Sequence, residues 1–188
     1  EEALLKIQST EFDAILTDIK MPIMSGIELL EIIHNLNPDI PVILDPVLAS
    51  GRGDELASED MVEAMLDILI PQTTIITPNS LEARRLAEYD SDEELDLGGC
   101  AQRLIEAGCE YVLVTGTHEN TPQVVNVLHG QDGVLRSDAW QRLPGSYHGS
   151  GCTLASAIAA SIAHGLDVGD AVREAQEYTW ASLQAGFR

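Results

Sequence analysis

Pro-Val-Ile-Leu-Asp-Pro-Val, residues 41–47, contains a short apolar strand that ends at a carboxylate. The run Pro41–Leu44 is too short and too rich in β-branched side chains for a helix, so it predicts a buried β-strand. Asp45 follows at the carboxyl end of this strand, where the sheets of α/β proteins present their ligand-binding groups. Because a carboxylate in that place can hold Mg²⁺, Asp45 is a candidate metal ligand.

The segments on either side of this strand alternate between strand and helix patterns. Phe12–Thr17 has the pattern of a buried strand, and Ser25–Leu36 has that of an amphipathic helix. Downstream, the sequence predicts helices at 58–70, 80–88, 93–107, 149–164 and 167–185, and strands at 74–76 and 111–114. Such alternation is typical of a three-layer α/β protein, in which a mostly parallel, doubly wound sheet carries helices on both faces.

Residues 123–140 depart from this alternation. Val-Val-Asn-Val-Leu-His is followed by Gly-Gln-Asp-Gly and then by Val-Leu-Arg-Ser-Asp-Ala-Trp. An Asp-Gly pair between two apolar runs is a signal of a tight turn. The sequence therefore predicts an antiparallel hairpin near residues 123–140 at an edge of the sheet.

The 188-residue chain is strongly acidic, with a formal net charge of −21. Few cations are available to displace phosphate counterions, so we expect no nucleic acid partner. No apolar run approaches the length of a membrane span and residues 1–3 do not resemble a signal peptide, so we expect a cytoplasmic protein without membrane contact. Cys100, Cys109 and Cys152 include no Cys-x-x-Cys pair, which favours free thiols.

The stretch Gly149-Ser150-Gly151-Cys152-Thr153 opens a helix whose following residues, up to Ala163, carry no charge. We expect this helix body to be buried, with the amides at its start facing a ligand. Unpaired N–H groups and the helix dipole stabilise a phosphate, and glycines let its oxygens approach the backbone. Gly149, Ser150 and Gly151 are therefore candidate catalytic residues that stabilise a transferred phosphoryl group. The alternative is that the glycines only turn the chain into the helix.

Three motifs, in order, resemble the hydroxymethylpyrimidine and phosphomethylpyrimidine kinases, a branch of the ribokinase-like superfamily. They are Asp45-Pro46-Val47, Thr77-Pro78-Asn79 with Glu82-Ala83, and His148–Thr153. This resemblance covers about residues 45–188 and implies ATP and Mg²⁺ as cofactors, with Asp45 at the metal. It further implies a cofactor-binding set that consists of Asn79, Glu82, Thr115 and Gly116. Thr115 departs from the family pattern, which usually has lysine there, and this departure predicts weaker phosphate binding.

Some of these assignments have a local alternative. Asn79 and Glu82 have the spacing of a helix N-cap and its capping-box partner. Cys152 matches the catalytic position that the wider superfamily fills with an aspartate acting as general base. A helix N-terminus is expected to lower the pKa of this thiol and make a thiolate available. The alternative for Cys152 is a small buried apolar side chain.

Residues 1–44 resemble a different family, the receiver domains of response regulators. The resemblance rests on Asp18-Ile19-Lys20-Met21-Pro22 and Gly26, after an apolar strand. It implies a phosphoacceptor at Asp18, but the acids that hold Mg²⁺ in that family have no counterpart, so Asp18 is predicted to be vestigial. We therefore predict one chimeric α/β domain, a hybrid of receiver-like residues 1–44 and kinase-like residues 45–188, of engineered origin.

The pyrimidine pocket with which the kinase family usually begins has no counterpart in this sequence. The leading hypothesis is therefore a chimera that retains the ATP- or phosphate-binding half of a phosphomethylpyrimidine kinase without catalytic turnover. One alternative is an active ATP-dependent hydroxymethylpyrimidine/phosphomethylpyrimidine kinase of thiamine biosynthesis, and another is a phosphorylatable receiver module. A sheet edge left open could also pair with a second copy of the chain, which would make a homo-oligomer.

Overall fold

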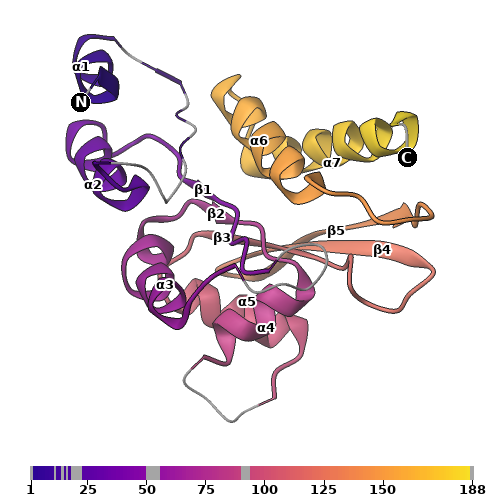
Figure 1. Ribbon diagram of the computed structural model, residues 1–188. Coiled ribbons are helices and arrows are strands. Elements are labelled where there is room, and N and C mark those ends of the chain that lie inside the picture. The colour runs from indigo at the N-terminus through magenta and orange to yellow at the C-terminus, as the bar shows by residue number, and fades with distance from the viewer. Residues whose placement is uncertain are drawn as a thin grey trace.

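The computed structural model describes residues 2–10, 12, 13, 15, 17, 23–49, 56–89 and 94–186. Within these ranges the chain forms one five-stranded sheet with helices on both faces (Figure 1). The candidate phosphoacceptor Asp18 lies outside the described residues.

The sheet has the strand order β1-β2-β3-β4-β5, which is also the order of these strands along the chain. The strands are β1 (Ile43–Leu44), β2 (Ile75–Ile76), β3 (Tyr111–Thr115), β4 (Gln123–Gly130) and β5 (Gly133–Gln141). β1, β2 and β3 are parallel, whereas β4 is antiparallel to both β3 and β5. The predicted hairpin is confirmed. The sheet is mixed rather than mostly parallel, because the two longest strands form this hairpin, in which β4 pairs antiparallel with β3 and β5 pairs antiparallel with β4.

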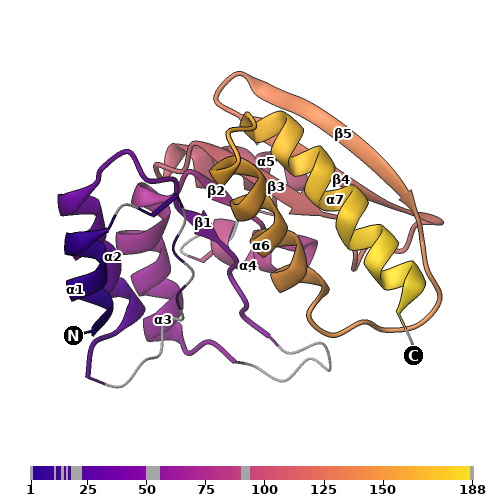
Figure 2. The same cartoon turned by 90° about the horizontal axis from the view of Figure 1, so that it is seen from above.

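Helices on both faces give the three layers that the sequence predicts. One face carries α3 (Glu59–Ala64), α4 (Ser80–Ala87) and α5 (Leu97–Glu106), and the other carries α6 (Ser150–Ala163) and α7 (Val168–Ala185). The helices α1 (Glu2–Ser9) and α2 (Gly26–Leu36) lie beyond the β1 edge (Figure 2). The predicted hybrid has a receiver-like half, whose fold class is called flavodoxin-like. This half is not evident in the described residues, since their strands follow one another in simple chain order.

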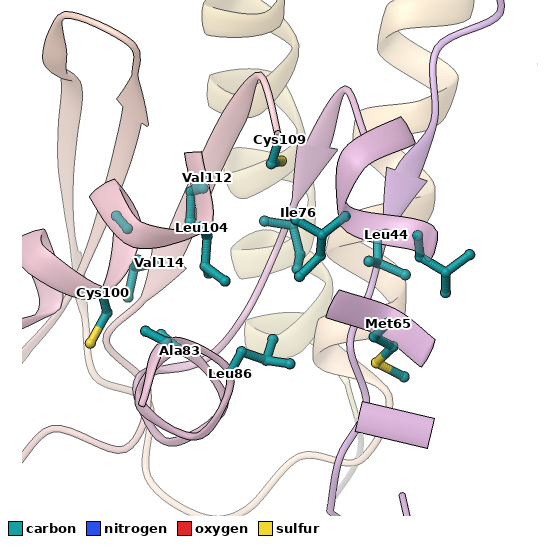
Figure 3. Close-up of a cluster of buried hydrophobic side chains, with 14 of the residues drawn as sticks. Leu44, Met65, Ile76, Ala83, Leu86, Cys100, Leu104, Cys109, Val112 and Val114 are labelled. Carbon is teal, nitrogen blue, oxygen red and sulfur yellow. The ribbon is translucent and has the colours of Figure 1, made fainter. Parts of the chain in front are cut away.

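Alternate residues of the central strands supply two hydrophobic cores. Ile76 and Val112 point toward α3, α4 and α5, where they join a cluster that includes Leu86 and Leu104 (Figure 3). The neighbouring strand residues Ile75 and Leu113 instead join a cluster under α6 and α7, with Leu128, Leu154, Ile158 and Val172. Because successive strand side chains point to opposite faces, a strand buried on both sides has a continuous apolar sequence.

Three predicted elements differ from the structure. The described residues between 12 and 17 are not in a strand. The predicted helix 58–70 is α3 followed by a π-helical segment η1 (Met65–Leu69) and a 3₁₀ turn η2 (Ile70–Gln72), which contains Pro71, a residue without an N–H for an α-helical bond. The helix predicted from residue 93 begins as α5 at Leu97, because Asp96 caps it through a bond from the Gly99 amide of 2.7 Å.

The uncharged helix α6 is only partly buried, which corrects the expectation from its composition. Its buried residues are Leu154, Ala155, Ile158 and Ser161. Cys152, Ser156 and Ala160 are exposed and line a groove of about 600 Å³ between α6 and α7. Within the described parts of the chain, every helix is too short or too polar to span a lipid bilayer.

Candidate functional site

The start of α6 is shaped by a glycine in the left-handed region. Gly149 has φ 79° and ψ 6° and is the N-cap of α6, with no side chain to bond the first-turn amides. An L residue would be strained at this φ. The amide of Thr153 bonds the Gly149 carbonyl at 2.9 Å and closes the first turn. The geometry therefore leaves amides at the beginning of a 14-residue helix without a capping side chain.

The carboxylate of Asp45 faces this helix start. A Cβ atom built on Gly151 would lie 3.7 Å from Oδ1 and 3.8 Å from Oδ2 of Asp45. The thiol of Cys152 lies beside the same carboxylate and interacts with it. Burial raises the pKa of Asp45, and the interaction with Cys152 opposes this shift. The strand-end acid and the glycine-rich helix start, 106 residues apart along the chain, thus meet in one place.

The pKa of Cys152 is raised, opposite in direction to the prediction from its place at a helix N-terminus. Partial burial is the largest cause, followed by the interaction with Asp45 and the negative charge of that carboxylate. Burial and the nearby carboxylate together disfavour the thiolate more than the end of the helix favours it. Cys152 is therefore a thiol rather than a thiolate.

Glu82 is a buried carboxylate, 9% exposed, beside the same cluster. Its Oε1 accepts from the Leu48 amide at 3.3 Å and its Oε2 from the Asn79 amide at 2.9 Å. Burial raises the pKa of Glu82, these backbone bonds oppose the shift, and the charge of Asp45 adds to it. Glu82 therefore connects the loop after β1 to the start of α4.

Asn79 and Glu82 form the capping box that their spacing predicts. The Oδ1 atom of Asn79 accepts from the amides of Leu81 and Glu82, each at 3.0 Å. Together with the bond from the Asn79 amide to Glu82, this satisfies the amides of Asn79, Leu81 and Glu82 at the start of α4. Asn79 therefore serves as the helix cap that was the alternative to a nucleotide contact. Any contact with a nucleotide would have to use the NH₂ group of its side chain.

Thr115 and Gly116 end β3 next to this cap. Thr115 forms an isolated parallel bridge with Asn79, and its amide bonds the Pro78 carbonyl at 2.9 Å. A Cβ atom on Gly116 would lie only 2.4 Å from the Val125 carbonyl oxygen, so the close approach of β4 requires glycine there. The candidate residues therefore lie next to one another at the carboxyl ends of β1, β2 and β3. In order of contact they are Gly151, Asp45, Glu82, Asn79, Thr115 and Gly116.

Sequence reasoning missed a polar group that belongs to this region. Asn126 is buried in β4, and its Oδ1 accepts from the Gly116 amide at 3.2 Å. Its side-chain amide donates to Gln176 of α7 at 2.9 Å. A lone asparagine inside the apolar run Val-Val-Asn-Val-Leu is a signal that could have found it, since buried polar groups need partners.

The donor set at Asp45 fits Mg²⁺ held jointly with a nucleotide. Mg²⁺ in kinases is bound by one or two carboxylates together with substrate phosphates and water. Asp45 is available for this role, whereas both oxygens of Glu82 already accept backbone bonds. Among the residues that the structure describes, no three metal-ligating side chains gather at one point. Phosphates and water would therefore have to supply most of the ligands.

The fold is that of the ribokinase-like kinases. The chain superposes on an ADP complex of Bacillus subtilis pyridoxal kinase with a TM-score of 0.82 and 27% identity, over 100% of this chain and 71% of that chain.

The sequence model of the phosphomethylpyrimidine kinase family matches residues 6–188, and the chain belongs to this family. It is 34% identical over 175 residues to a hydroxymethylpyrimidine/phosphomethylpyrimidine kinase of Streptomyces coelicolor, covering 90% of this chain and 63% of that protein. It is 35% identical over 156 residues to the enzyme of the same name from Mycobacterium bovis, covering 82% of this chain and 56% of that protein. The chain thus spans about six tenths of the length of these relatives.

The family match corrects the prediction of a chimera. The matched range includes residues 6–44, which the resemblance to receiver domains assigns to a different family. The receiver resemblance rests on the short motif Asp18–Pro22 with Gly26. The strand, helix and strand around this motif are common to many α/β folds, so they distinguish the two families poorly. The fused receiver segment, the engineered origin and the catalytically silent hybrid therefore have no support.

Proposed function

We propose that this protein is an ATP-dependent kinase that phosphorylates the hydroxymethyl group of a pyrimidine, or the phosphorylated form of that pyrimidine. The relatives at 34% and 35% identity are named for this activity. One observation carries the proposal most directly, namely the Asp45 carboxylate within 3.8 Å of the position of a Cβ on Gly151. A metal-binding acid and an anion-binding helix start side by side are what phosphoryl transfer needs.

The start of α6 would bind the phosphate that moves. Amides of Ser150, Gly151 and Cys152 lie in the first turn, with no capping side chain from Gly149. They would hydrogen-bond the equatorial oxygens of the γ-phosphoryl group as charge redistributes in the transition state. Mg²⁺ held by Asp45 would neutralise phosphate charge.

The nucleotide would lie along the ends of β2 and β3. We assign nucleotide binding to four residues that lie next to one another beside Asp45. They are Asn79, Glu82, Thr115 and Gly116. The relative in the ADP complex, at 27% identity, supports a nucleotide as ligand. Thr115 can offer a hydroxyl but no charge, so phosphate recognition would depend more on backbone amides.

The proton of the substrate hydroxyl must be accepted as the new O–P bond forms and the bond to the leaving ADP oxygen breaks. Cys152 is the candidate acceptor, because it is exposed at the helix start. Its thiol is protonated in the ligand-free protein, in part because Asp45 is negative. To act as a base, Cys152 would first have to release its own proton to solvent, which a lower pKa beside a neutralised Asp45 would allow. The thiolate would then accept the proton of the substrate hydroxyl.

A second candidate substrate is a pyridoxal-type pyridine. The chain is 30% identical over 152 residues to a Bacillus subtilis pyridoxine kinase, and it superposes on a pyridoxal kinase with a TM-score of 0.82. Both substrate types carry a hydroxymethyl group on an aromatic nitrogen ring, so the same phosphoryl-transfer groups would serve either. An assay of ADP release with each compound separates the two proposals.

Calorimetric titration with MgATP tests the nucleotide part of the proposal. Asp45→Ala and Gly151→Asp should each abolish saturable binding, because the first removes the carboxylate and the second puts an anion into the helix start. Asp132→Ala, in the exposed hairpin turn, is the matched control and should bind as the wild type does. Folded wild-type protein that binds no MgATP, or variants that bind it unchanged, would contradict the proposal.

A further inference from the structure

The loop Gly116–Thr121, which joins β3 to β4, is held by an arginine from outside the candidate site. Arg142 follows β5, and its guanidinium donates only to main-chain oxygens of this loop in the bonds that the structure describes. The acceptors and distances are the carbonyls of Gly116 (3.4 Å), Thr117 (2.8 Å), Glu119 (2.8 Å) and Thr121 (2.9 Å). Because the guanidinium group is rigid and donates to four carbonyls at once, it fixes the path of this backbone segment.

This arrangement also orients the amides of the loop. In a trans peptide the N–H points opposite to the carbonyl of the preceding residue, and no cis peptide is present in the described residues. The carbonyls of Gly116, Thr117 and Glu119 face Arg142, so the amides of Thr117, His118 and Asn120 point away from it. Those three residues are exposed. The loop therefore presents backbone donors on the side opposite the arginine.

Two further contacts hold the same loop. Its first amide, that of Gly116, donates to Asn126, which is itself fixed by Gln176. Glu119 pairs with Arg84 of α4 at 3.0 Å, and the hydrogen bond from Arg84 lowers the pKa of Glu119. The loop is thus tied to β4, to α4 and to the segment after β5, which are three separate parts of the fold.

We propose that Arg142, assisted by Asn126, is a positioning residue that holds the Gly116–Thr121 loop in the conformation that nucleotide binding requires. The inference rests on the proposed function, in which the nucleotide binds at the end of β3. Thr115 bridges Asn79, whose amide bonds Glu82 beside Asp45, so the loop continues directly from the candidate site around Asp45. Arg142 itself acts through the backbone it holds and not on the ligand.

The test compares wild-type protein with Arg142→Ala and Arg142→Lys, using MgADP as the probe. Arg142→Ala should raise the Kd for MgADP about tenfold, and Arg142→Lys should recover part of the loss because it keeps a donor near the carbonyls. Arg103→Ala is the matched control: Arg103 also donates to a carbonyl, that of Ala87, but on α5 away from the loop. It should bind MgADP as the wild type does.

Hydrogen exchange of the ligand-free proteins supplies a readout that does not depend on nucleotide. Arg142→Ala should speed exchange within residues 116–121 and leave α5 protected, which a general loss of stability would not do. Unchanged exchange in the loop overturns the inference, and so does faster exchange with an unchanged Kd. Wild-type protein that binds no MgADP overturns the proposed function and this inference together, whereas the preceding two outcomes leave the proposed function intact. If Arg142→Ala does not fold, the same comparisons are made with Arg142→Lys.

Discussion

The thiol of Cys152, at the start of α6, lies beside the carboxylate of Asp45, at the end of β1, and interacts with it. This contact joins the strand-end acid to the helix that the sequence marks as an anion site. Burial raises the pKa of Cys152 and the negative carboxylate raises it further, while the thiol partly offsets the effect of burial on the pKa of Asp45. The reactivity of Cys152 therefore depends in part on the charge at Asp45.

Replacement of Asp45 should make Cys152 more reactive. In metal-free buffer at about pH 8, Asp45→Asn should alkylate several-fold faster with iodoacetamide, because loss of the anion lowers the pKa of Cys152 and increases the thiolate fraction. Asp132→Asn is the control and should react at the wild-type rate. Cys100 and Cys109 are buried, with burial raising the pKa of Cys109 to about 11, so both should react only after unfolding. A slower reaction in Asp45→Asn would contradict the contact.

Gly116 should not tolerate a methyl group. Gly116→Ala would place a Cβ 2.4 Å from the Val125 carbonyl oxygen and should lower the free energy of unfolding by about 1–3 kcal/mol through overpacking. The control is Gly98→Ala in α5, where the nearest atom would be 3.4 Å away and alanine favours the helix by about 0.5–1 kcal/mol. Urea denaturation of both variants measures the contrast. Equal stability of the two proteins would show that β4 can move away from Gly116.

The buried acid Asp138 should contribute stability that is lost in acid. Burial alone would raise its pKa, but hydrogen bonds from Arg136, Arg173 and Gln176 together lower the pKa below the usual 3.8. The contribution is therefore complete above the unfolded-state pKa and disappears as the pH falls through the lower folded-state value. Asp138→Asn should cost about 2 kcal/mol near neutral pH, the scale of hydrogen bonds to a charged group. The difference from wild type in urea unfolding should shrink below pH 3.8; a constant difference would contradict the prediction.

Removal of the Asn79 cap should destabilise α4 even without any ligand. Asn79→Ala leaves the amides of Leu81 and Glu82 without their acceptor and should cost about 1 kcal/mol. Asn79→Ser, which can still cap, should keep most of the stability in thermal unfolding. If both variants also bind MgATP as the wild type does, Asn79 serves only as a cap, and its proposed contact with the nucleotide is wrong.

Much of the fold follows from local patterns in the sequence. Short β-branched runs predict β1, β2 and β3, and Asp132-Gly133 between two apolar runs predicts the β4–β5 hairpin. The patterns failed where they were least specific. The resemblance of residues 1–44 to receiver domains rests on one short motif, Asp18–Pro22 with Gly26, within a strand-and-helix pattern that many α/β families share, and the family match over residues 6–188 shows that this assignment is wrong. The start of α5 differs from the prediction because the Asp96 cap, rather than periodicity, determines where that helix begins. The change from α3 into the π-helical segment η1 has no signal in the periodicity.

The candidate site could be predicted residue by residue but not as an arrangement. The motifs point to Asp45, Asn79 and Gly149 one at a time, while nothing local indicates that Asn126 bonds Gly116 or that Arg142 holds the loop after it. The predicted low pKa of Cys152 was wrong for the same reason. A helix terminus is visible in the sequence, but a carboxylate 107 residues upstream is not known to be a neighbour until the chain folds.

By itself the sequence determined most of the element types, the glycines at the start of α6 and the net negative charge, because these depend on propensities and charges that can be read within a few residues. Only the tertiary structure decided which of these elements meet. The parallel pairing of β1, β2 and β3 brings the ends of three strands to one edge, and α6 packs across them so that Gly151 lies against Asp45. Proximity between distant residues depends on how the whole core packs, and so do the pKa values and hydrogen bonds that this proximity creates.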